Sequence, residues 1–379
     1  MKLEAVELRR IGIPLVAPFE TSFGVQLERD ILLLKAITSD GEGWGECVAG
    51  EEPTYSPEYV DGAQHVLTHH LLPRLFARHE LTAEDVFGLL RPVHGHQMAK
   101  AAIEMAVLDA QLRTRGESFG KYFGATRPEV DCGVSVGIHR AIPDLLHTVG
   151  DFLDQGYRRV KLKIKPGWDI EPVRAVRERF GDVPLQVDAN TAYRLSDARH
   201  LAELDDFDLL LIEQPMPEDQ VLAHAEMAEI VGTPICLDES IHSLQAAADA
   251  IELRACRIIN IKPGRVGGYL EARRIHDLCA AHAIPVWMGG MLETGLGRAG
   301  NVAMAAMPNF ALPGDTSASD RYYHRDIITE PFVLHDGRLA VPSGPGLGVT
   351  VDEDRLREVT TSVELVSSGA RSSATTRSR

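Results

Sequence analysis

Short apolar runs recur along the middle of the chain, between residues 160 and 262, and each ends in a charged side chain. The charged residues follow one another at intervals of 24 or 25 positions, and a helix-compatible segment lies in every interval. Strands that alternate with helices predict a parallel sheet with right-handed crossovers, which closes most naturally into a (β/α) barrel. The active site of such a barrel lies at the C-terminal ends of its strands, so the charges are expected to meet at one mouth. These residues are Lys163, Asp188, Glu213, Asp238 and Lys262.

The barrel is predicted to occupy residues 126–325. Its first strand is expected at Val130–Ile138, its seventh at Ile284–Met288 and its eighth at Phe310–Leu312. Beyond Arg325 the alternation of strands and helices stops.

The first 125 residues have a different pattern, with strands followed by helices. Leu3–Ile13 alternates apolar and polar positions and Asp30–Thr38 reads as a second strand, which predicts an antiparallel α+β domain. Two loops with aromatic side chains, Pro18–Gln26 and Cys47–Pro57, are either exposed surface or a lid over a small substrate. Helices are predicted at Ser56–Leu72, Thr82–Leu90 and Met98–Arg113.

The C-terminal residues are predicted to return to the first domain. A hairpin is expected in Pro331–Val341, around Asp336 and Gly337, so that residues 326–366 complete the N-terminal domain. Residues 367–379 are rich in Ser, Thr and Arg without a hydrophobic pattern, which is typical of a disordered tail.

Composition narrows the functional classes. At 379 residues the chain exceeds the usual barrel of about 250 residues, in keeping with a second domain. A net charge of −16 argues against a nucleic-acid partner, since binding to the phosphate backbone needs clustered Lys and Arg. The apolar runs are too short to span a membrane and no signal-peptide core is evident, so we expect a cytoplasmic protein without a membrane partner. The five scattered cysteines indicate reduced core residues.

Three of the strand ends carry carboxylates. Asp188, Glu213 and Asp238 form an oxygen-only set, which suits Mg²⁺ and leaves positions for substrate oxygens. Any one of these acids could instead cap the helix that follows it. That explanation is weaker for three acids at equal spacing on successive strands. His65 and His69 lie four apart and could form half a metal site, although a solvated helix face is the more common explanation.

Lysines flank the three acids. Lys163 and Lys262 lie on the second and sixth predicted strands, opposite each other across an eight-stranded barrel, so a bound carboxylate would present its α-carbon between two amines. Lys161 and Lys163 point the same way about 7 Å apart, and a neighbouring cation or partial burial lowers the pKa of a lysine. This arrangement suits abstraction of a proton α to a carboxylate. Lysines that snorkel outward or pair with the acids are the alternative.

Several motifs resemble the enolase superfamily, in its muconate-cycloisomerase-like subgroup. Within it the resemblance is strongest to the family of o-succinylbenzoate synthases and N-acylamino acid (N-succinylamino acid) racemases, and it covers nearly the whole chain up to the tail. The motifs that carry it are Lys161–Lys163, Val187–Asn190, Ile212–Pro215, Leu237–Ser240 and Asn260–Gly268. Leu15–Phe19, Gly43–Cys47, Gly289–Gly295 and Leu312–Ala318 support it.

The resemblance implies a (β/α)7β modified TIM barrel under an α+β N-terminal capping domain. It further implies that Asp188, Glu213 and Asp238 bind Mg²⁺, for which Mn²⁺ or Co²⁺ can substitute, that Lys163 and Lys262 are the acid/base pair, and that Lys161 tunes Lys163. The loops at Phe19–Gly24 and Cys47–Tyr55 would then close over a small-molecule carboxylate, and the protein would be a homo-oligomer. The substrate-binding residues implied are Phe19, Phe23, Tyr55, Ser135, Asn190, Arg265, Gly290, Met291 and Leu292.

Two reactions could share this site. In racemisation of an N-acylamino acid, one lysine removes the α-proton and the other delivers a proton to the opposite face of an enediolate, a 1,1-proton transfer. In o-succinylbenzoate formation, which belongs to menaquinone biosynthesis, one lysine removes the proton and returns it to the departing hydroxyl while the other stays cationic. Arg265 resembles the racemase branch, so racemase with accompanying synthase activity is favoured over a dedicated synthase. More remote alternatives are another muconate-cycloisomerase-like enzyme and a non-catalytic scaffold, which would have a defective site.

Overall fold

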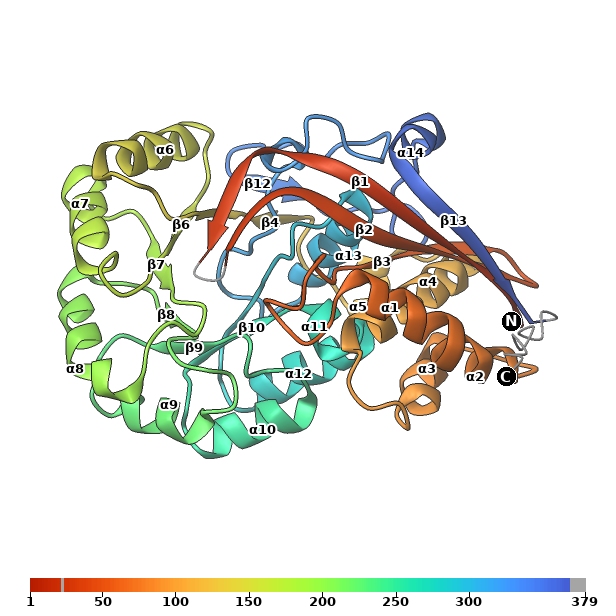
Figure 1. Cartoon of the computed structure of the whole chain (residues 1–379), viewed down its shortest axis with the longest axis horizontal. Helices are drawn as coiled ribbons and strands as arrows, with labels where there is room; N and C mark the ends of the chain where they lie inside the picture. Colours follow the sequence, from red (N-terminus) through yellow and green to blue (C-terminus); the bar gives the residue numbers. More distant parts are fainter. Residues whose placement is uncertain (22–23, 369–379) are drawn as a thin grey trace, which may run out of the picture.

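The computed structural model describes residues 1–21 and 24–368, which fold into an antiparallel sheet and a curled parallel sheet (Figure 1). The antiparallel sheet has the strand order β13-β1-β2-β3, and the parallel sheet has the order β11-β10-β9-β8-β7-β6-β5. The predicted α/β class, with a modified barrel and an N-terminal capping domain, is confirmed.

A long hairpin dominates the N-terminal sheet. β1 (Leu3–Thr21) and β2 (Gly24–Thr38) pair from Leu3 to Pro14 and again from Phe19 to Thr21, with an irregularity between these stretches, and they arch over the barrel in Figure 1. The loop predicted within Pro18–Gln26 is wrong for the described residues, because Phe19 pairs with Gln26. This end of the hairpin is largely exposed on both faces, so its sequence lacks the apolar alternation that marks a strand. Phe23 lies outside the described residues.

The helices of the N-terminal domain pack against β3 (Glu42–Cys47) and β2. The closest approach is between β3 and α4, where an added Cβ on Gly45 would lie 2.1 Å from the Ala102 carbonyl oxygen. The single helix predicted over Ser56–Leu72 is instead a run interrupted by the π-helical turn η1 (Leu67–Leu71). The helices are α1 (Val60–Val66), α2 (Leu72–Phe76), α3 (Ala83–Leu90), α4 (Gln97–Arg115) and α5 (Phe119–Phe123).

The parallel strands carry the predicted charged residues at or just beyond their C-terminal ends. The register of the sheet sets Lys163 beside Asp188 and Asp188 beside Glu213, so these strand ends are level. The strands are β5 (Gly133–Val136), β6 (Arg159–Lys163), β7 (Leu185–Asp188), β8 (Ile212–Glu213), β9 (Ile235–Leu237), β10 (Ile258–Ile261) and β11 (Val286–Met288).

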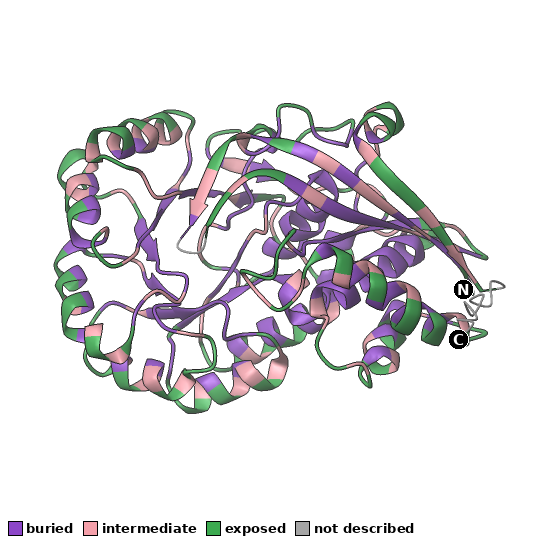
Figure 2. Cartoon of the chain, viewed as in Figure 1, coloured by how far each residue is buried: buried purple, intermediate pink, exposed green. Residues whose placement is uncertain are grey.

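Helices cover the outside of this sheet, with buried faces toward the strands and exposed faces outward (Figure 2). They are α6 (Ile142–Asp154), α7 (Ile170–Phe180), η2 (Leu195–Asp197), α8 (Ala198–Leu201), η3 (Ala202–Phe207), α9 (Val221–Ala228), α10 (Leu244–Glu252) and α12 (Tyr269–Ala281). The helices α11 (Pro263–Val266) and α13 (Gly295–Ala305) have no exposed residue, and α11 packs against α4.

The eighth strand, predicted at Phe310–Leu312, is present only as isolated parallel bridges. Phe310 bridges to Val286 of β11, and Gly314 bridges to Cys132 next to β5. Gly133 donates a backbone hydrogen bond to the Gly314 carbonyl oxygen at 2.8 Å. The segment therefore joins the two edges of the sheet and closes the barrel without forming a regular strand.

The C-terminal segment, which includes the short turn η4 (Ser319–Arg321) and α14 (Glu353–Val359), adds one strand to the antiparallel sheet and forms a separate two-stranded sheet. The turn at Asp336 and Gly337 is present, with left-handed φ values of 48° and 73°, but its strand β12 (Arg338–Ala340) pairs with β4 (Glu129–Asp131) at the start of the barrel. β13 (Thr360–Ser367) then pairs with β1. The predicted tail begins too early, because Ser367 is the last residue of β13, and residues 369–379 lie outside the described part.

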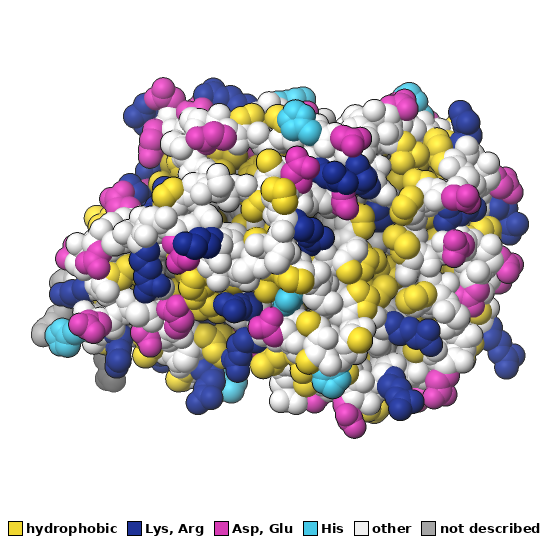
Figure 3. All heavy atoms as spheres, turned by 180° about the vertical axis from the view of Figure 1, so that it is seen from behind, with side chains coloured by type: hydrophobic (Ala, Val, Ile, Leu, Met, Phe, Trp, Pro, Cys, Tyr) yellow, Lys and Arg dark blue, Asp and Glu magenta, His cyan; other side chains and the backbone are white. Residues whose placement is uncertain are grey.

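No described helix has the length and apolar composition needed to cross a membrane. All five cysteines are buried and carry free thiols. On the face seen in Figure 3, Lys and Arg side chains are interspersed with Asp and Glu side chains, a mixture that produces no large field of one sign.

Candidate active site

Lys161 and Lys163 of β6 reach the same carboxylate oxygen of the neighbouring strand. The Nζ atoms of Lys161 and Lys163 lie 3.2 and 2.6 Å from Asp188 Oδ2. Lys163 also donates to Asn190 Oδ1 at 2.6 Å. The prediction that these two lysines share one face of their strand is confirmed.

Lys161 is surrounded by acids. Its Nζ also lies 3.0 Å from Glu213 Oε2 and 2.8 Å from Asp315 Oδ2. Burial lowers the pKa of Lys161, but the carboxylates of Asp315, Glu213 and Asp188 outweigh burial and hold that pKa well above its usual value. Lys161 is therefore a fixed positive charge at the centre of the strand ends.

Asp315 is a member of this cluster to which the sequence analysis gave no role. It bonds Lys161 on one side and Arg159 Nη1 on the other, at 2.9 Å. Burial raises the pKa of Asp315, but Lys161 and Arg159 outweigh it and bring the pKa well below its usual range. Asp315 lies three positions after the predicted eighth strand, whereas Asp188 directly follows its apolar run, so the same rule marks Asp315 only weakly.

Lys262 lies on the far side of the strand ends, directly after β10. Its Nζ is 2.8 Å from Asp238 Oδ2 and donates to Tyr55 Oη at 3.1 Å. Burial lowers the pKa of Lys262, while Asp238 and Tyr55 raise it, so that the net shift is upward. Tyr55 belongs to the segment after β3, and the capping domain thus contributes to the site.

Arg265, predicted to bind substrate, lies behind Asp238 on the short helix α11. Its Nη1 bonds Asp238 Oδ1, its Nε donates to the Ile241 carbonyl oxygen at 2.8 Å, and its Nη2 donates to the Asn260 carbonyl oxygen at 2.7 Å. It is buried and is absent from the described residues that line the cavity. In this structure Arg265 contacts a predicted metal ligand, the backbone and the hydroxyl of Tyr55, to which its Nη1 donates at 3.3 Å.

Two polar residues connect the ends of different strands, Gln214 from β8 to β9 and Asn260 from β10 to β8. Gln214, in the left-handed region at φ 37°, accepts the backbone N–H of Asp238 at 2.9 Å and donates to Ser240 Oγ at 2.8 Å. Asn260 donates to Glu213 Oε1 at 2.7 Å. The left-handed backbone of Gln214 is unfavourable for a residue with a side chain, which indicates that the surrounding contacts impose it.

Glu239 is a further buried acid that the sequence analysis did not assign. Its Oε1 accepts from Asn190 Nδ2 at 2.9 Å, and its Oε2 has no hydrogen-bond partner among the described residues. Burial raises the pKa of Glu239 to about 8, with Asp238 and Asp188 adding to the shift.

A cavity of about 460 Å³ opens above the lysines, between the barrel and the capping domain. Its volume is typical of a small-molecule site. Predicted site residues that line it are Phe19, Tyr55, Ser135, Lys161, Lys163, Asn190, Lys262, Gly290, Met291 and Leu292. Charged residues from β2 also line it, and the sequence analysis had assigned none of them.

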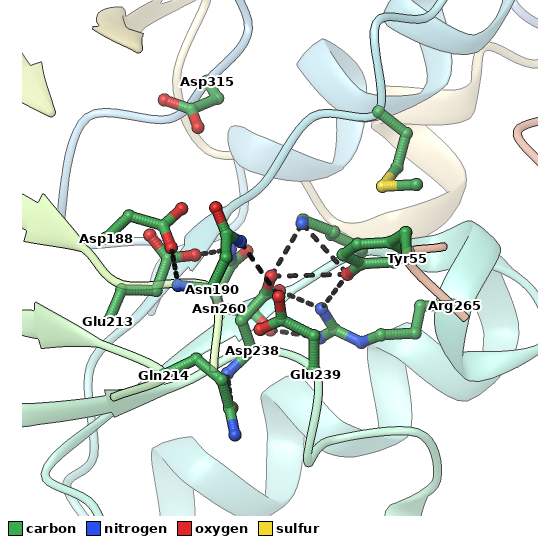
Figure 4. Close-up of polar contacts among 12 residues, drawn as sticks. Tyr55, Asp188, Asn190, Glu213, Gln214, Asp238, Glu239, Asn260, Arg265 and Asp315 are labelled. Carbon is green, nitrogen blue, oxygen red and sulfur yellow. Dashed lines mark hydrogen bonds and ion pairs between the residues drawn. The ribbon is translucent and has the colours of Figure 1, made fainter. Parts of the chain in front are cut away.

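The three predicted metal ligands, Asp188, Glu213 and Asp238, are fully buried at the ends of β7, β8 and β9 (Figure 4). Burial raises the pKa of Glu213 to about 7, and the Asp188 carboxylate adds to this shift. Such crowded carboxylates need positive charge, and an all-oxygen set fits a hard divalent cation. In the described conformation lysine and arginine groups supply that charge, and no three described Asp, Glu, His or Cys side chains converge as a ligand set. The carboxylate oxygens suit a divalent cation, and binding would require the lysine and arginine side chains to move away from them.

The comparisons with known proteins agree with this geometry. Residues 5–124 match the mandelate racemase / muconate lactonizing enzyme N-terminal domain, and residues 144–355 match the enolase C-terminal domain-like family. The chain belongs to the enolase superfamily. Members of the superfamily generally depend on a divalent metal.

Relatives place the chain more narrowly. It is 66% identical to an N-succinylamino acid racemase from Amycolatopsis, over 95% of this chain and 98% of that protein. It is 47% identical to an o-succinylbenzoate synthase from Geobacillus kaustophilus, over 95% of this chain and 96% of the relative. A crystal structure of an enolase-superfamily member from Listeria innocua superimposes with a TM-score of 0.94 at 41% identity, over 97% of this chain and all of that one. The protein is thus an enzyme of the family that contains these racemases and synthases.

Proposed function

We propose that the protein is a Mg²⁺-dependent N-acylamino acid racemase that works with two lysines. The observation that carries this proposal is the placement of Lys163 and Lys262 on one cavity, from β6 and β10, with β7, β8 and β9 between them. Two amines on opposite sides of a bound carboxylate can serve the two faces of its α-carbon. The 66% identity to a protein named N-succinylamino acid racemase supports the same reaction.

Asp188, Glu213 and Asp238 would hold the cation. When bound, the cation would stabilise the negative charge that develops on the substrate carboxylate as the α-proton leaves. Within the chain, Lys163 accepts the proton from one face and Lys262 donates a proton to the other, and the reverse direction exchanges these roles. Lys161, which also pairs with Asp315 outside the proposed ligand set, keeps a positive charge next to Lys163.

A second candidate is o-succinylbenzoate synthase, the name of relatives that are 42–47% identical to this chain. In that reaction one lysine removes the α-proton and returns it to a departing hydroxyl, and the other remains cationic. The same two lysines serve both reactions, so the enzyme could carry out either.

The test is α-proton exchange followed by NMR in D₂O with Mg²⁺, using each enantiomer of N-succinylmethionine. Wild type is expected to exchange and interconvert both hands, whereas Lys163→Ala and Lys262→Ala each abolish exchange of one hand. Lys165→Ala is a matched control, because Lys165 is two positions beyond Lys163 but is absent from the described cavity lining. Wild type that exchanges neither hand yet dehydrates the synthase substrate would refute the racemase proposal. Treatment with a chelator should abolish exchange, and added Mg²⁺ should restore it.

A further inference from the structure

Arg29 of β2 is a buried guanidinium that lines the same cavity as Lys163 and Lys262. Only 4% of its surface is exposed. It belongs to the capping domain, whereas the lysines belong to the barrel, so positive groups reach the cavity from both domains. The carboxylates of Glu28 and Asp30, on either side of Arg29 in the sequence, also line the cavity.

The guanidinium of Arg29 is poorly satisfied within the protein. Nη2 makes only long hydrogen bonds, 3.3 and 3.4 Å, to the carbonyl oxygens of Val48 and Ala49, and Nε is buried without a hydrogen-bond partner among the described residues. Asp30, the next residue on the strand, pairs with Arg10 instead. A buried charge without a counter-charge is costly, so a cavity-lining guanidinium of this kind is suited to an anionic ligand.

The proposed substrates supply such an anion. The names of both groups of relatives contain a succinyl group, a four-carbon acyl chain that ends in a carboxylate. With the reacting carboxylate at the strand ends, this second carboxylate lies at the far end of the molecule. A guanidinium presents a planar fork of donors that matches a carboxylate.

We propose that Arg29 binds the distal carboxylate of the acyl group and makes the enzyme selective for dicarboxylic acyl chains. This inference rests on the proposed function, and it holds for either of the two reactions, because both substrates end in the same group. The alternative to this proposal is a purely structural role, in which Arg29 only donates hydrogen bonds to the backbone at Val48 and Ala49 and does not contact the acyl group.

The experiment compares N-succinylmethionine with the N-succinamoyl analogue, in which a neutral amide replaces the distal carboxylate. Wild type is expected to favour the succinyl substrate in kcat/KM. Arg29→Met should lower kcat/KM for that substrate by about 10- to 100-fold, mainly through KM, and change the amide analogue by less than about threefold. Arg29→Lys keeps the positive charge but not the planar pair of donors, so its kcat/KM for the succinyl substrate should lie between those of wild type and Arg29→Met.

Arg9→Met is the matched control, since it removes the same charge from the neighbouring strand, and neither Arg9 nor its ion-pair partner Glu7 is among the described residues that line the cavity. It should leave the preference for succinyl substrates unchanged. Equal loss for both substrates in Arg29→Met would support the structural alternative and overturn the proposal.

Calorimetric binding to wild type keeps the inference separate from catalysis. We expect N-succinylmethionine to bind more tightly than its amide analogue, whether or not either compound is turned over. Absence of turnover would refute the proposed racemase reaction but not the role of Arg29. Equal affinity for the two compounds would refute the role of Arg29 whatever reaction the enzyme catalyses, and it decides the matter if Arg29→Met does not fold.

Discussion

Tyr55 of the capping domain lies directly on Lys262 of the barrel. Lys262 Nζ donates to Tyr55 Oη at 3.1 Å and sits 4.8 Å from the centroid of the ring, and Tyr55 Oη lies 3.3 Å from Asp238 Oδ2. Tyr55 and Lys262 are 207 positions apart in the chain. One of the two proposed acid/base groups is therefore oriented by a residue of the other domain.

Removal of the Tyr55 hydroxyl should impair the enzyme while leaving its fold intact. Tyr55→Phe keeps the ring over the ammonium group but loses a hydrogen bond to a charged donor, so we expect kcat/KM to fall about tenfold. Tyr55→Ala should lose more. The measurement is steady-state kinetics with both enantiomers of the substrate.

Tyr59→Phe is the control for this change, because Tyr59 lies four positions away and is 40% exposed. Wild-type kinetics in Tyr55→Phe would show that the contact with Lys262 has no role in turnover.

The strand ends could be predicted from the sequence, because the parallel strands from β6 to β10 show the same local pattern, an apolar run followed by a charged residue. Asp188, Glu213 and Lys163 lie level for that reason. Asp315 follows the same rule, but its strand is reduced to isolated bridges, so its apolar run is short and its signal weak.

Contacts that depend on tertiary packing could not be predicted from local periodicity. Arg29 has no special feature in its own stretch of sequence, and only the fold turns it toward the cavity. The resemblance implies that Arg265 binds substrate, yet α11 directs it onto Asp238. Proximity between segments that are distant in the chain depends on tertiary packing, which local periodicity does not encode.

Asp315 is expected to be essential for stability. Asp315→Asn would leave the buried cations Lys161 and Arg159 without their shared carboxylate, and loss of one partner of a buried pair costs about 3–5 kcal/mol. The free energy of unfolding from urea titration measures this cost. Asp30→Asn breaks a more exposed pair with Arg10 and should cost about 1 kcal/mol or less. Equal costs for the two variants would contradict the prediction.

Glu104 should make stability depend on pH. Burial raises the pKa of Glu104 to about 7, although backbone N–H groups of Leu270 and Tyr269 oppose the shift. Between the unfolded pKa near 4.3 and about 7, the folded protein holds a proton that the unfolded chain has released, so this contribution to stability is lost as pH rises.

Glu104→Gln is neutral at every pH and lacks this loss. Relative to wild type, its free energy of unfolding should therefore improve by about 2 kcal/mol between pH 5 and pH 7.5. Denaturant titration of both proteins at the two pH values measures the difference. A constant difference would mean that Glu104 is already ionised in the folded protein at pH 5.

Two glycines of the capping domain should respond oppositely to the same substitution. Gly45→Ala would place a Cβ 2.1 Å from the backbone oxygen of Ala102, where β3 meets α4, and neither backbone can move without disturbing the core. We expect a loss of more than about 3 kcal/mol or failure to fold. Gly88 lies in the exposed part of α3 with nothing within 4 Å of its added Cβ, so Gly88→Ala should stabilise the protein by about 0.5–1 kcal/mol through helix propensity. Thermal denaturation of both variants measures the contrast. A Gly45→Ala protein that melts with wild type would mean that the close packing of β3 on α4 is not required for the fold.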